Sequence, residues 1–380
     1  MASDQEYMAL AIQLAKQGLY TTSPNPRVGC VLVKNDEIIG QGFHITAGEG
    51  HAEVNALADA EQRGNDPQGA TAYVTLEPCS HFGRTPPCAQ GLIDAKVTRV
   101  VGAMTDPNPQ VAGNGFNRLR AAGIEVMDNC LAAESAKLNP GFIKRMSSAT
   151  INDKTSKAAL PFVRLKMATS LDGRTAMQSG ESQWITGPEA RAEVQRIRAQ
   201  SCAIICGADS VLIDDPSMNV RIGSAYADNI RQPLRVIIDS QHRVQADAKI
   251  FTHPGKVMIV SPTEPKSAIH SDVCSVSYVK SEARLNNGRP QVDLKHLLHT
   301  LAGQGINEVL VESGAKLAGA FIEYDLVDEL VMFTAPTLLG NDARPAFNLP
   351  FSKMEQQIRW SWHDVRMVGN DLKLVLKATK

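Results

Sequence analysis

The sequence predicts an α/β protein built from two consecutive domains, and three observations support this. The 380 residues are more than one hydrophobic core ordinarily serves. Apolar strand patterns alternate with amphipathic helix patterns along most of the chain, as in layered α/β folds. A small, polar stretch without periodicity, residues 147–160, separates two such regions and is expected to be a linker. The predicted domains are therefore residues 1–146 and 161–380.

The first region opens with an amphipathic helix over residues 4–18. Residues 27–44 predict a β-hairpin, because their alternation is interrupted by the polar run Lys34-Asn35-Asp36. Helix and strand patterns then take turns: a helix over 51–64, a strand over 71–78, and a helix followed by a strand within both 89–104 and 116–126. This β-β-α-β-α-β-α-β order predicts a three-layer domain.

The second region begins with a strand over 162–170 and a helix over 186–200, in which Thr186 and Glu189 stand at capping-box spacing. Compact apolar runs, typical of strands buried in a parallel sheet, cover 202–207, 234–240 and 256–262. The remaining pattern predicts a helix over 293–305, a strand over 307–314, a helix over 315–326, and closing strands within 327–340 and at 371–378.

Composition limits the functions that the chain can have. A formal net charge of −1 gives no general attraction for nucleic acid or anionic membranes. The first residues lack the basic segment of a signal peptide, and no apolar run approaches the length of a membrane span. We therefore expect a cytoplasmic protein. Its seven cysteines, an odd number, argue against a disulfide framework and favour metal ligands or core packing.

One imidazole and two thiols form an ordered set in the first region. His51 stands at a predicted helix start, and Cys79 and Cys88 lie in a stiff, proline-rich segment after the next strand. Three such ligands suit zinc and leave its fourth position open, as in catalytic sites. Bound zinc lowers the pKa of a coordinated water to about 7. Glu53, two residues after His51, is placed to move the proton, so the set predicts hydrolytic removal of an amino group. The alternative is ordinary packing, the usual role of buried free cysteines.

A small-residue turn follows an apolar strand in the second region. Gly314, Ala315 and Gly319 would let a phosphate approach backbone N–H groups at the start of the helix over 315–326. The alternative is a tight strand-to-helix turn with no ligand, because the pattern is neither GxGxxG nor a Walker loop. Cys202 and Cys206 are expected to be core residues.

The spacing of the two cysteines identifies a more specific pattern. Zinc deaminases of nucleosides and polynucleotides carry PCxxC, whereas this chain carries PCSHFGRTPPC. That departure resembles the bifunctional deaminase/reductases of riboflavin biosynthesis, and the match runs from about Tyr7 to near the C-terminus. The other matching stretches are residues 24–33, 51–57, 75–88, 106–109, 170–174, 182–187 and 214–216.

The resemblance implies a cytidine-deaminase-like N-terminal domain and a C-terminal domain similar to dihydrofolate reductase. It implies that His51, Cys79 and Cys88 bind one zinc ion, that Glu53 is the proton shuttle, and that His81 lies outside the zinc shell. It also implies NADPH as cofactor of the second domain. Pyrimidine contacts would come from Asn25, His44 and Arg84. Cofactor contacts would come from Ala168, Trp184, Ser210, Asp214, Ser240, Gly314, Ala315, Lys316, Leu317, Ala318, Gly319 and Ala320. Further substrate contacts would come from Ser182, Arg198, Met218, Arg221 and Glu312.

Each of these contacts also has an ordinary structural interpretation. Asn25 is a usual turn former, His44 ends a strand pattern, and Arg84 is compatible with a solvated loop. Arg198 fits a solvated helix position, Trp184 fits a core position, and Asp214 fits a turn before Pro216. Asp214 and Glu312 are both candidates for a general acid in the reduction, and the sequence does not decide between them.

The resemblance implies two consecutive reactions on a phosphorylated pyrimidine. The first domain would deaminate a diaminopyrimidinone ribosylamino phosphate, and the second would reduce its ribosyl chain to ribityl with NADPH. No nucleic acid or membrane partner is expected, and homo-oligomerisation is left open. Two alternatives remain: a tRNA-type deaminase with an accessory binding domain, and a non-catalytic zinc scaffold. The missing basic surplus weighs against the former.

Overall fold

The computed structural model describes residues 2–80, 87–109, 111–148, 159–223, 230–265, 267–286 and 288–379. The chain divides into two compact units, Met1–Leu160 and Pro161–Lys380, each with its own sheet. Most of the predicted linker 147–160 lies outside the described residues. Within them, no helix is long and apolar enough to cross a membrane.

The first unit contains a five-stranded sheet in the order β2-β1-β3-β4-β5. Strand β1 is antiparallel to both of its neighbours, whereas β3, β4 and β5 are parallel. The predicted hairpin turn is present, since Asn35 and Asp36 both have positive φ, of 53° and 64°. The strands are β1 (Gly29–Lys34), β2 (Glu37–Phe43), β3 (Thr71–Val74), β4 (Arg99–Gly102) and β5 (Glu125–Met127).

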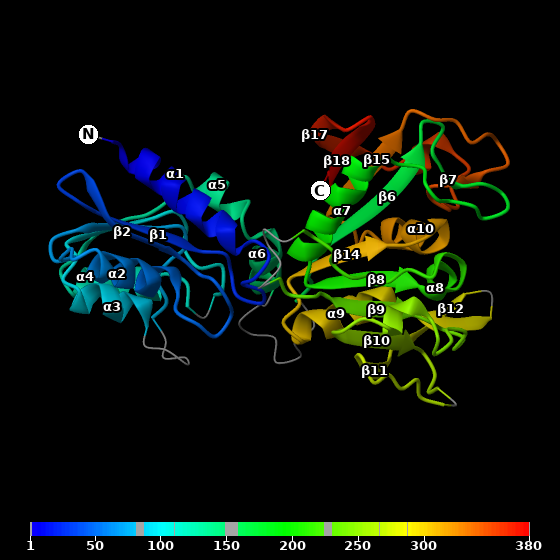
Figure 1. The fold of residues 1–380 in the computed structure, drawn as a ribbon, viewed down its shortest axis with the longest axis horizontal. Helices are drawn as coiled ribbons and strands as arrows, with labels where there is room; N and C mark the ends of the chain where they lie inside the picture. The colour runs from blue at the N-terminus through cyan, green and yellow to red at the C-terminus, as the bar shows by residue number, and fades with distance from the viewer. Residues whose placement is uncertain are drawn as a thin grey trace. The chain divides into compact units, whose positions relative to one another are not determined.

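Helices cover both faces of this sheet, which confirms the three layers (Figure 1). Alternation along β1 explains them: Val31 and Val33 pack in one core cluster with α1, and Cys30 and Leu32 pack in another with α2, α3 and α4. The helices are α1 (Asp4–Ala15), α2 (Ala52–Gln62), α3 (Cys88–Asp94), α4 (Asn114–Ala121), α5 (Ala132–Ala136) and α6 (Pro140–Ser147).

The second unit contains a nine-stranded sheet in the order β11-β10-β9-β8-β14-β6-β15-β18-β17. Neighbouring strands are parallel from β11 to β15, and β18 is antiparallel to both of its neighbours, β15 and β17. The carboxyl ends of the parallel strands therefore meet at one edge. The strands are β6 (Phe162–Ser170), β8 (Ala203–Gly207), β9 (Leu234–Ile238), β10 (Lys256–Ser261), β11 (Ser275–Lys280), β14 (Glu308–Glu312), β15 (Glu329–Ala335), β17 (Trp360–Val368) and β18 (Asp371–Ala378).

Among the described residues, this unit also contains α-helices and two small strand pairs (Figure 1). The helices are α7 (Pro188–Gln200), α8 (Ala208–Asp214), α9 (Leu294–Gly303) and α10 (Ala315–Glu323), and the small pairs join β12 (Ala283–Asn286) to β13 (Arg289–Val292) and β7 (Arg174–Ala176) to β16 (Arg344–Pro345). An α/β fold is thus confirmed for both units.

Two sequence expectations need correction. The predicted capping box at Thr186 and Glu189 is absent: the N-cap of α7 is Gly187, whose N–H donates to the Asp371 carboxylate at 2.7 Å. A contact remote in sequence thus replaces the local cap. Strand β3 also ends at Val74, earlier than the predicted residue 78, because the segment leading to Cys79 leaves the sheet.

Candidate active sites

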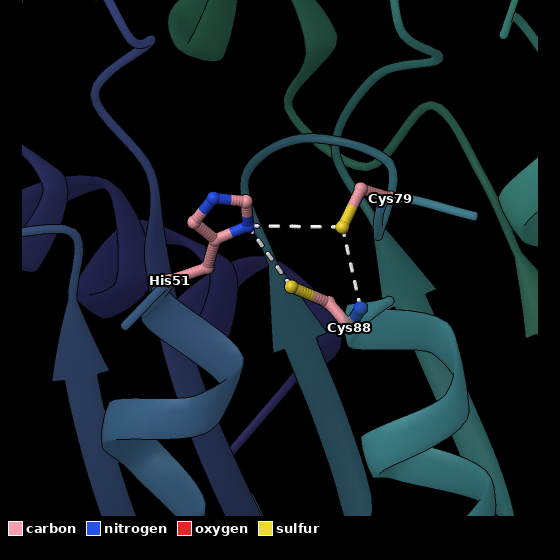
Figure 2. A group of neighbouring side chains, drawn as sticks. All are labelled: His51, Cys79 and Cys88. Atoms are coloured by element: carbon pink, nitrogen blue, oxygen red, sulfur yellow. Dashed lines mark hydrogen bonds between the residues drawn. The ribbon is translucent and has the colours of Figure 1, made fainter. Parts of the chain in front are cut away.

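Three predicted metal ligands come together where two helices begin. His51 is the N-cap of α2 and Cys88 is the first residue of α3, while Cys79 follows β3. His51 Nδ1 lies 3.1 Å from Cys88 Sγ and 3.7 Å from Cys79 Sγ. Figure 2 shows the imidazole facing both sulfur atoms, with the Cys88 N–H donating to Cys79 Sγ at 3.2 Å. The ligand atoms all lie within 4.8 Å of one another.

This arrangement fits a tetrahedral zinc ion. Bonds of about 2.1 Å to nitrogen and 2.3 Å to sulfur, at tetrahedral angles, place a nitrogen and a sulfur ligand about 3.6 Å apart. The two distances from His51 Nδ1 bracket that value. All seven cysteines are free thiols, so neither Cys79 nor Cys88 is consumed by a disulfide.

Hydrogen bonds among the three groups shift their pKa values even before a metal binds. Hydrogen bonds from Cys88, and then from His51, lower the pKa of Cys79 to about 4 although burial opposes them. The hydrogen bond to Cys79 and burial raise the pKa of Cys88. The hydrogen bond to Cys79 raises the pKa of His51, against the effect of burial. Negative charge that can bind a cation is thus favoured on Cys79 Sγ, whereas Cys88 loses its proton only when a cation binds.

Glu53 is placed beside this cluster rather than in solvent. It lies in the first turn of α2 with 3% of its surface exposed. Burial, assisted by the charge of Cys79, raises the pKa of Glu53 to about 7. A carboxyl group in this state can both accept and return a proton near neutral pH.

Two predicted pyrimidine contacts join the same site through the ring of His44. Its Nδ1 lies 3.0 Å from the Gly50 carbonyl and its Nε2 lies 3.1 Å from Asn25 Nδ2. The His44 ring packs edge-on against His51, with the ring centroids 5.1 Å apart. Because a carbonyl only accepts, Nδ1 carries the proton, and burial lowers the pKa of His44, which favours the neutral ring. Nε2 then accepts from Asn25 Nδ2.

Two residues that support the cysteines escaped the sequence-based prediction. The buried carboxylate of Glu77 accepts four backbone N–H groups, from Asp106, Gly113, Gly115 and Phe116, at 2.7–3.3 Å. Arg118 on α4 donates to the Ser80 carbonyl at 3.3 Å and to Gln90 Oε1 at 2.6 Å. Glu77 thus anchors the segment that leads to Cys79, and Arg118 joins the residues that follow the two cysteines.

Close backbone packing completes this support. A Cβ built on Gly115 would lie 2.0 Å from the Pro78 carbonyl oxygen, so α4 approaches the segment before Cys79 as nearly as a glycine allows. Arg84, a predicted pyrimidine contact, and His81, expected to lie outside the zinc shell, both lie outside the described residues.

A second group of predicted residues meets in the other unit around Glu312. Arg198 donates to both carboxylate oxygens of Glu312, through Nε at 2.6 Å and Nη2 at 3.1 Å. Arg198 Nη2 also lies 3.7 Å from Met218 Sδ. Arg221 is exposed and hydrogen-bonds to Asn219, whose carbonyl accepts from Arg198 Nη1 at 3.2 Å.

Lys166 belongs to this group and was missed by the sequence-based prediction. It pairs in register with Glu312 across β6 and β14, and its Nζ lies 3.7 Å from Glu312 Oε2. Burial alone would raise the pKa of Glu312, but Arg198 and Lys166 more than offset it, so the net shift is downward. Burial lowers the pKa of Lys166, and Glu312 opposes this shift. The sequence around Lys166 gave no sign of this pairing, because Glu312 lies on a neighbouring strand that is distant in the chain.

The predicted cofactor contacts follow the carboxyl ends of several parallel strands. Ala168 lies near the end of β6, Ser210 and Asp214 lie on α8 after β8, and Ser240 follows β9. Asp214 accepts from predicted Ser182 at 3.1 Å. Trp184 is 69% exposed, unlike a core residue, and the Arg191 guanidinium carbon lies 4.6 Å from its ring centroid.

The run from Gly314 to Ala320 has two different surroundings. Gly314 is the exposed N-cap of α10, and Lys316 is also exposed. Ala318 and Gly319 are buried instead, and a Cβ at Gly319 would lie 2.1 Å from the Asn348 carbonyl oxygen. Ala315, Leu317 and Ala320 are half-buried. The first residues of the run thus present backbone to solvent, while Gly319 lets α10 pack closely against the chain.

Comparisons with known proteins show relatives of both units. The family described as "Cytidine and deoxycytidylate deaminase zinc-binding region" matches residues 1–104, and the family "RibD C-terminal domain" matches residues 161–374. "Riboflavin biosynthesis protein RibD" of Haemophilus influenzae is 47% identical and that of Escherichia coli is 46% identical, each over 98% of this chain and 97% and 99% of their own lengths.

Solved structures show the same similarity over the full length. Acinetobacter baumannii RibD matches with a TM-score of 0.87 and 47% identity, covering 99% of both chains. A Thermotoga maritima diaminohydroxyphosphoribosylaminopyrimidine deaminase/5-amino-6-(5-phosphoribosylamino)uracil reductase matches with a TM-score of 0.85 and 32% identity, again over 99% of both chains.

Proposed function

Because the chain belongs to the RibD family of bifunctional riboflavin-biosynthesis enzymes, we propose that its two units carry out two consecutive steps on one phosphorylated pyrimidine. It is a deaminase, and hence a hydrolase, and a reductase that uses zinc and NADPH. The N-terminal domain, residues 1–146, would deaminate 2,5-diamino-6-(5-phosphoribosylamino)pyrimidin-4(3H)-one. The C-terminal domain, residues 161–380, would then reduce the ribosyl chain of the product to ribityl.

We assign the deamination to the cluster at the starts of α2 and α3. His51, Cys79 and Cys88 hold zinc, which when bound lowers the pKa of a coordinated water to near neutrality. Glu53 would carry both protons of the attacking water in turn: it takes the first and gives it to the ring nitrogen, then takes the second and gives it to the departing amine, which leaves as ammonia. Glu53 is buried, which limits exchange of these protons with solvent. The convergence of the three ligands beside a buried carboxyl group is the observation that supports this role most strongly.

Asn25 and His44 orient the pyrimidine in this proposal. The neutral His44 ring is fixed by the Gly50 carbonyl and in turn holds the amide nitrogen of Asn25. Asn25 Oδ1 therefore faces the ligand as an acceptor and suits an amino group or ring N–H. Arg84 remains a proposed contact of the phosphorylated substrate.

We assign the substrate of the second step to the group around Glu312. NADPH supplies the hydride when it is bound, so the protein chiefly orients the two reactants. Buried Glu312 and half-buried Lys166 form a polar pair suited to the opened sugar. All three guanidinium nitrogens of Arg198 are engaged by Glu312 and Asn219, so Arg198 acts through Glu312, and exposed Arg221 is the better contact for the 5-phosphate.

Two separate signals test the proposed function. The protein is incubated with the diaminopyrimidinone phosphate, with and without NADPH, while ammonia release and NADPH absorbance are followed independently. Ammonia release in both cases, with NADPH loss only when both compounds are present, is the expected result. Zinc without turnover of this compound would favour a scaffold. RNA binding with a steep salt dependence would instead revive a tRNA-type deaminase. We still predict that the protein binds neither nucleic acid nor a membrane.

A further inference from the structure

The chain segment that carries Met218 and Arg221 is held by side chains rather than by a sheet or a helix. Described residues 215–223 lie outside any helix or strand, so the N–H and C=O groups of this segment need other partners. Met218 also has a positive φ of 49°, a conformation that a residue with a side chain seldom adopts. The segment therefore keeps its shape through contacts with its surroundings.

Two glutamines from different parts of the unit supply such contacts beside Arg221. Gln195 Oε1 accepts from the N–H of Arg221 itself at 2.8 Å. Gln232 binds both backbone groups of Val220: its Oε1 accepts from the N–H at 2.9 Å, and its Nε2 donates to the carbonyl at 3.2 Å. Because a backbone N–H only donates and a carbonyl only accepts, this double contact requires a side-chain amide in one orientation.

We propose that Gln195 and Gln232 are positioning residues of the reductase, which hold residues 219–221 so that the Arg221 guanidinium meets the 5-phosphate of the substrate. The proposal rests on the role given to Arg221 above. A long, exposed arginine side chain samples many conformations, and fixing the main chain that carries it lowers the entropy lost when it binds a phosphate. Both glutamines act through Arg221 and need no contact with the substrate.

Helix α7 contributes two neighbouring side chains to this clamp. Gln195 and Arg198 are three residues apart on α7 and therefore share a face of the helix. Arg198 Nη1 donates to the Asn219 carbonyl at 3.2 Å, while Gln195 accepts from the Arg221 N–H. Arg198 also binds Glu312, so one helix face joins the segment to the carboxylate assigned to the opened sugar.

The guanidinium of Arg221 stays accessible although its main chain is fixed. Its Nη1 donates to Asn219 Oδ1, a contact within the same segment, and the side chain is exposed. Val220, which lies between these two residues, is buried. A guanidinium carries five N–H donors, so pairing with Asn219 leaves others for a phosphate.

The test uses the deaminated substrate with and without its 5-phosphate, on variants of the full-length, zinc-loaded protein. Gln195→Met and Gln232→Met keep the length of the side chain and remove the amide. Each should raise KM for the phosphorylated substrate about fivefold or more, the effect of losing a hydrogen bond, and change kcat and the KM for NADPH little. With the dephosphorylated compound, both variants should match the unaltered protein, because Arg221 then has no phosphate to bind.

Gln356→Met is the matched control. Gln356 Oε1 also accepts from two backbone N–H groups, those of Ser352 at 2.8 Å and Lys353 at 2.9 Å, but Gln356 is exposed and precedes the edge strand β17. This variant should leave the KM for both forms of the substrate unchanged.

A double-mutant cycle shows whether the glutamines act through Arg221. Added to Arg221→Ala, neither Gln195→Met nor Gln232→Met should weaken the phosphorylated substrate further. Calorimetry on protein loaded with NADP⁺, which has no hydride to transfer, gives the same comparison as binding affinities.

Three outcomes would overturn the proposal: equal losses for both forms of the substrate, losses that add to that of Arg221→Ala, or an unchanged KM in the single variants. The first two would assign the glutamines a general structural role. An unaltered protein that oxidises no NADPH with the deaminated substrate would instead contradict the reductase function itself.

Discussion

The guanidinium of Arg118 donates to the side-chain oxygen of Gln90 at 2.6 Å, and through its other terminal nitrogen it donates to the Ser80 carbonyl at 3.3 Å. Ser80 follows Cys79, and Gln90 lies two residues after Cys88. One side chain on α4 therefore holds together the two chain segments that supply the thiol ligands.

Arg118→Met should loosen zinc without unfolding the unit. Residues that orient metal ligands typically contribute about 10-fold to 100-fold to metal affinity, so we expect zinc transfer to a coloured chelator to be at least about tenfold faster. Arg120→Met is the matched control, since Arg120 lies on the same helix but pairs at the surface with Asp128 at 3.7 Å. Equal release rates for the two variants would show that Arg118 does not position the cysteines.

Glu53→Gln should retain zinc but lose deamination. The amide keeps the size of the side chain and removes its ability to accept a proton, which costs about 10²-fold to 10⁴-fold in reactions of this kind. Ammonia release measures the loss, metal analysis confirms that zinc is bound, and NADPH oxidation with deaminated substrate reports the intact second unit. Retained ammonia release would remove Glu53 from the mechanism.

Removal of zinc by a chelator should separate the two activities. Within the described residues, the three clustered ligands all belong to Met1–Leu160, whereas the group around Glu312 belongs to Pro161–Lys380. We therefore expect ammonia release to stop while NADPH oxidation with deaminated substrate continues, and ammonia release to recover when zinc is restored. Simultaneous loss of both activities would mean that the second unit depends on the metal.

The reductase should lose activity on the alkaline side at a lower pH than an ordinary lysine would give. Burial lowers the pKa of Lys166 below 10.5, so its ammonium form disappears as the pH rises through that lowered value. Glu312 acts to raise this pKa, so Glu312→Gln should move the alkaline limb of kcat/KM to still lower pH. A limb that stays in place, or moves upward, would exclude the Lys166 ammonium as the group that controls it.

Strands β6 and β17 show how burial of side chains governs what a sequence can predict. Strand β6 begins and ends where its apolar pattern does, at Phe162 and Ser170. Strand β17 was not predicted, because it is an edge strand whose side chains, Trp362 and Met367 among them, are mostly exposed and give no buried-strand pattern. A strand shows a recognisable pattern of apolar residues only when one or both of its faces are buried.

The same distinction applies to the sites. His51, Cys79 and Cys88 could be chosen because few other functions need those side chains at that spacing. Arg118 could not, since a helical arginine that joins two loops looks the same in sequence as Arg120, which pairs at the surface. Lys166 was hidden for a related reason, because its partner Glu312 comes from a strand adjacent in the sheet and distant in the chain.

The contact between Gly115 and Pro78 has a consequence for redesign. Since no side chain fits between α4 and the segment before Cys79, the place of that sulfur is set by two main chains that touch directly. Attempts to adapt the site to a different aminated ring should therefore vary the proposed substrate contacts, such as Asn25, and leave Gly115 unchanged. A methyl group added at Gly115 would push against Pro78 and displace the nearby Cys79.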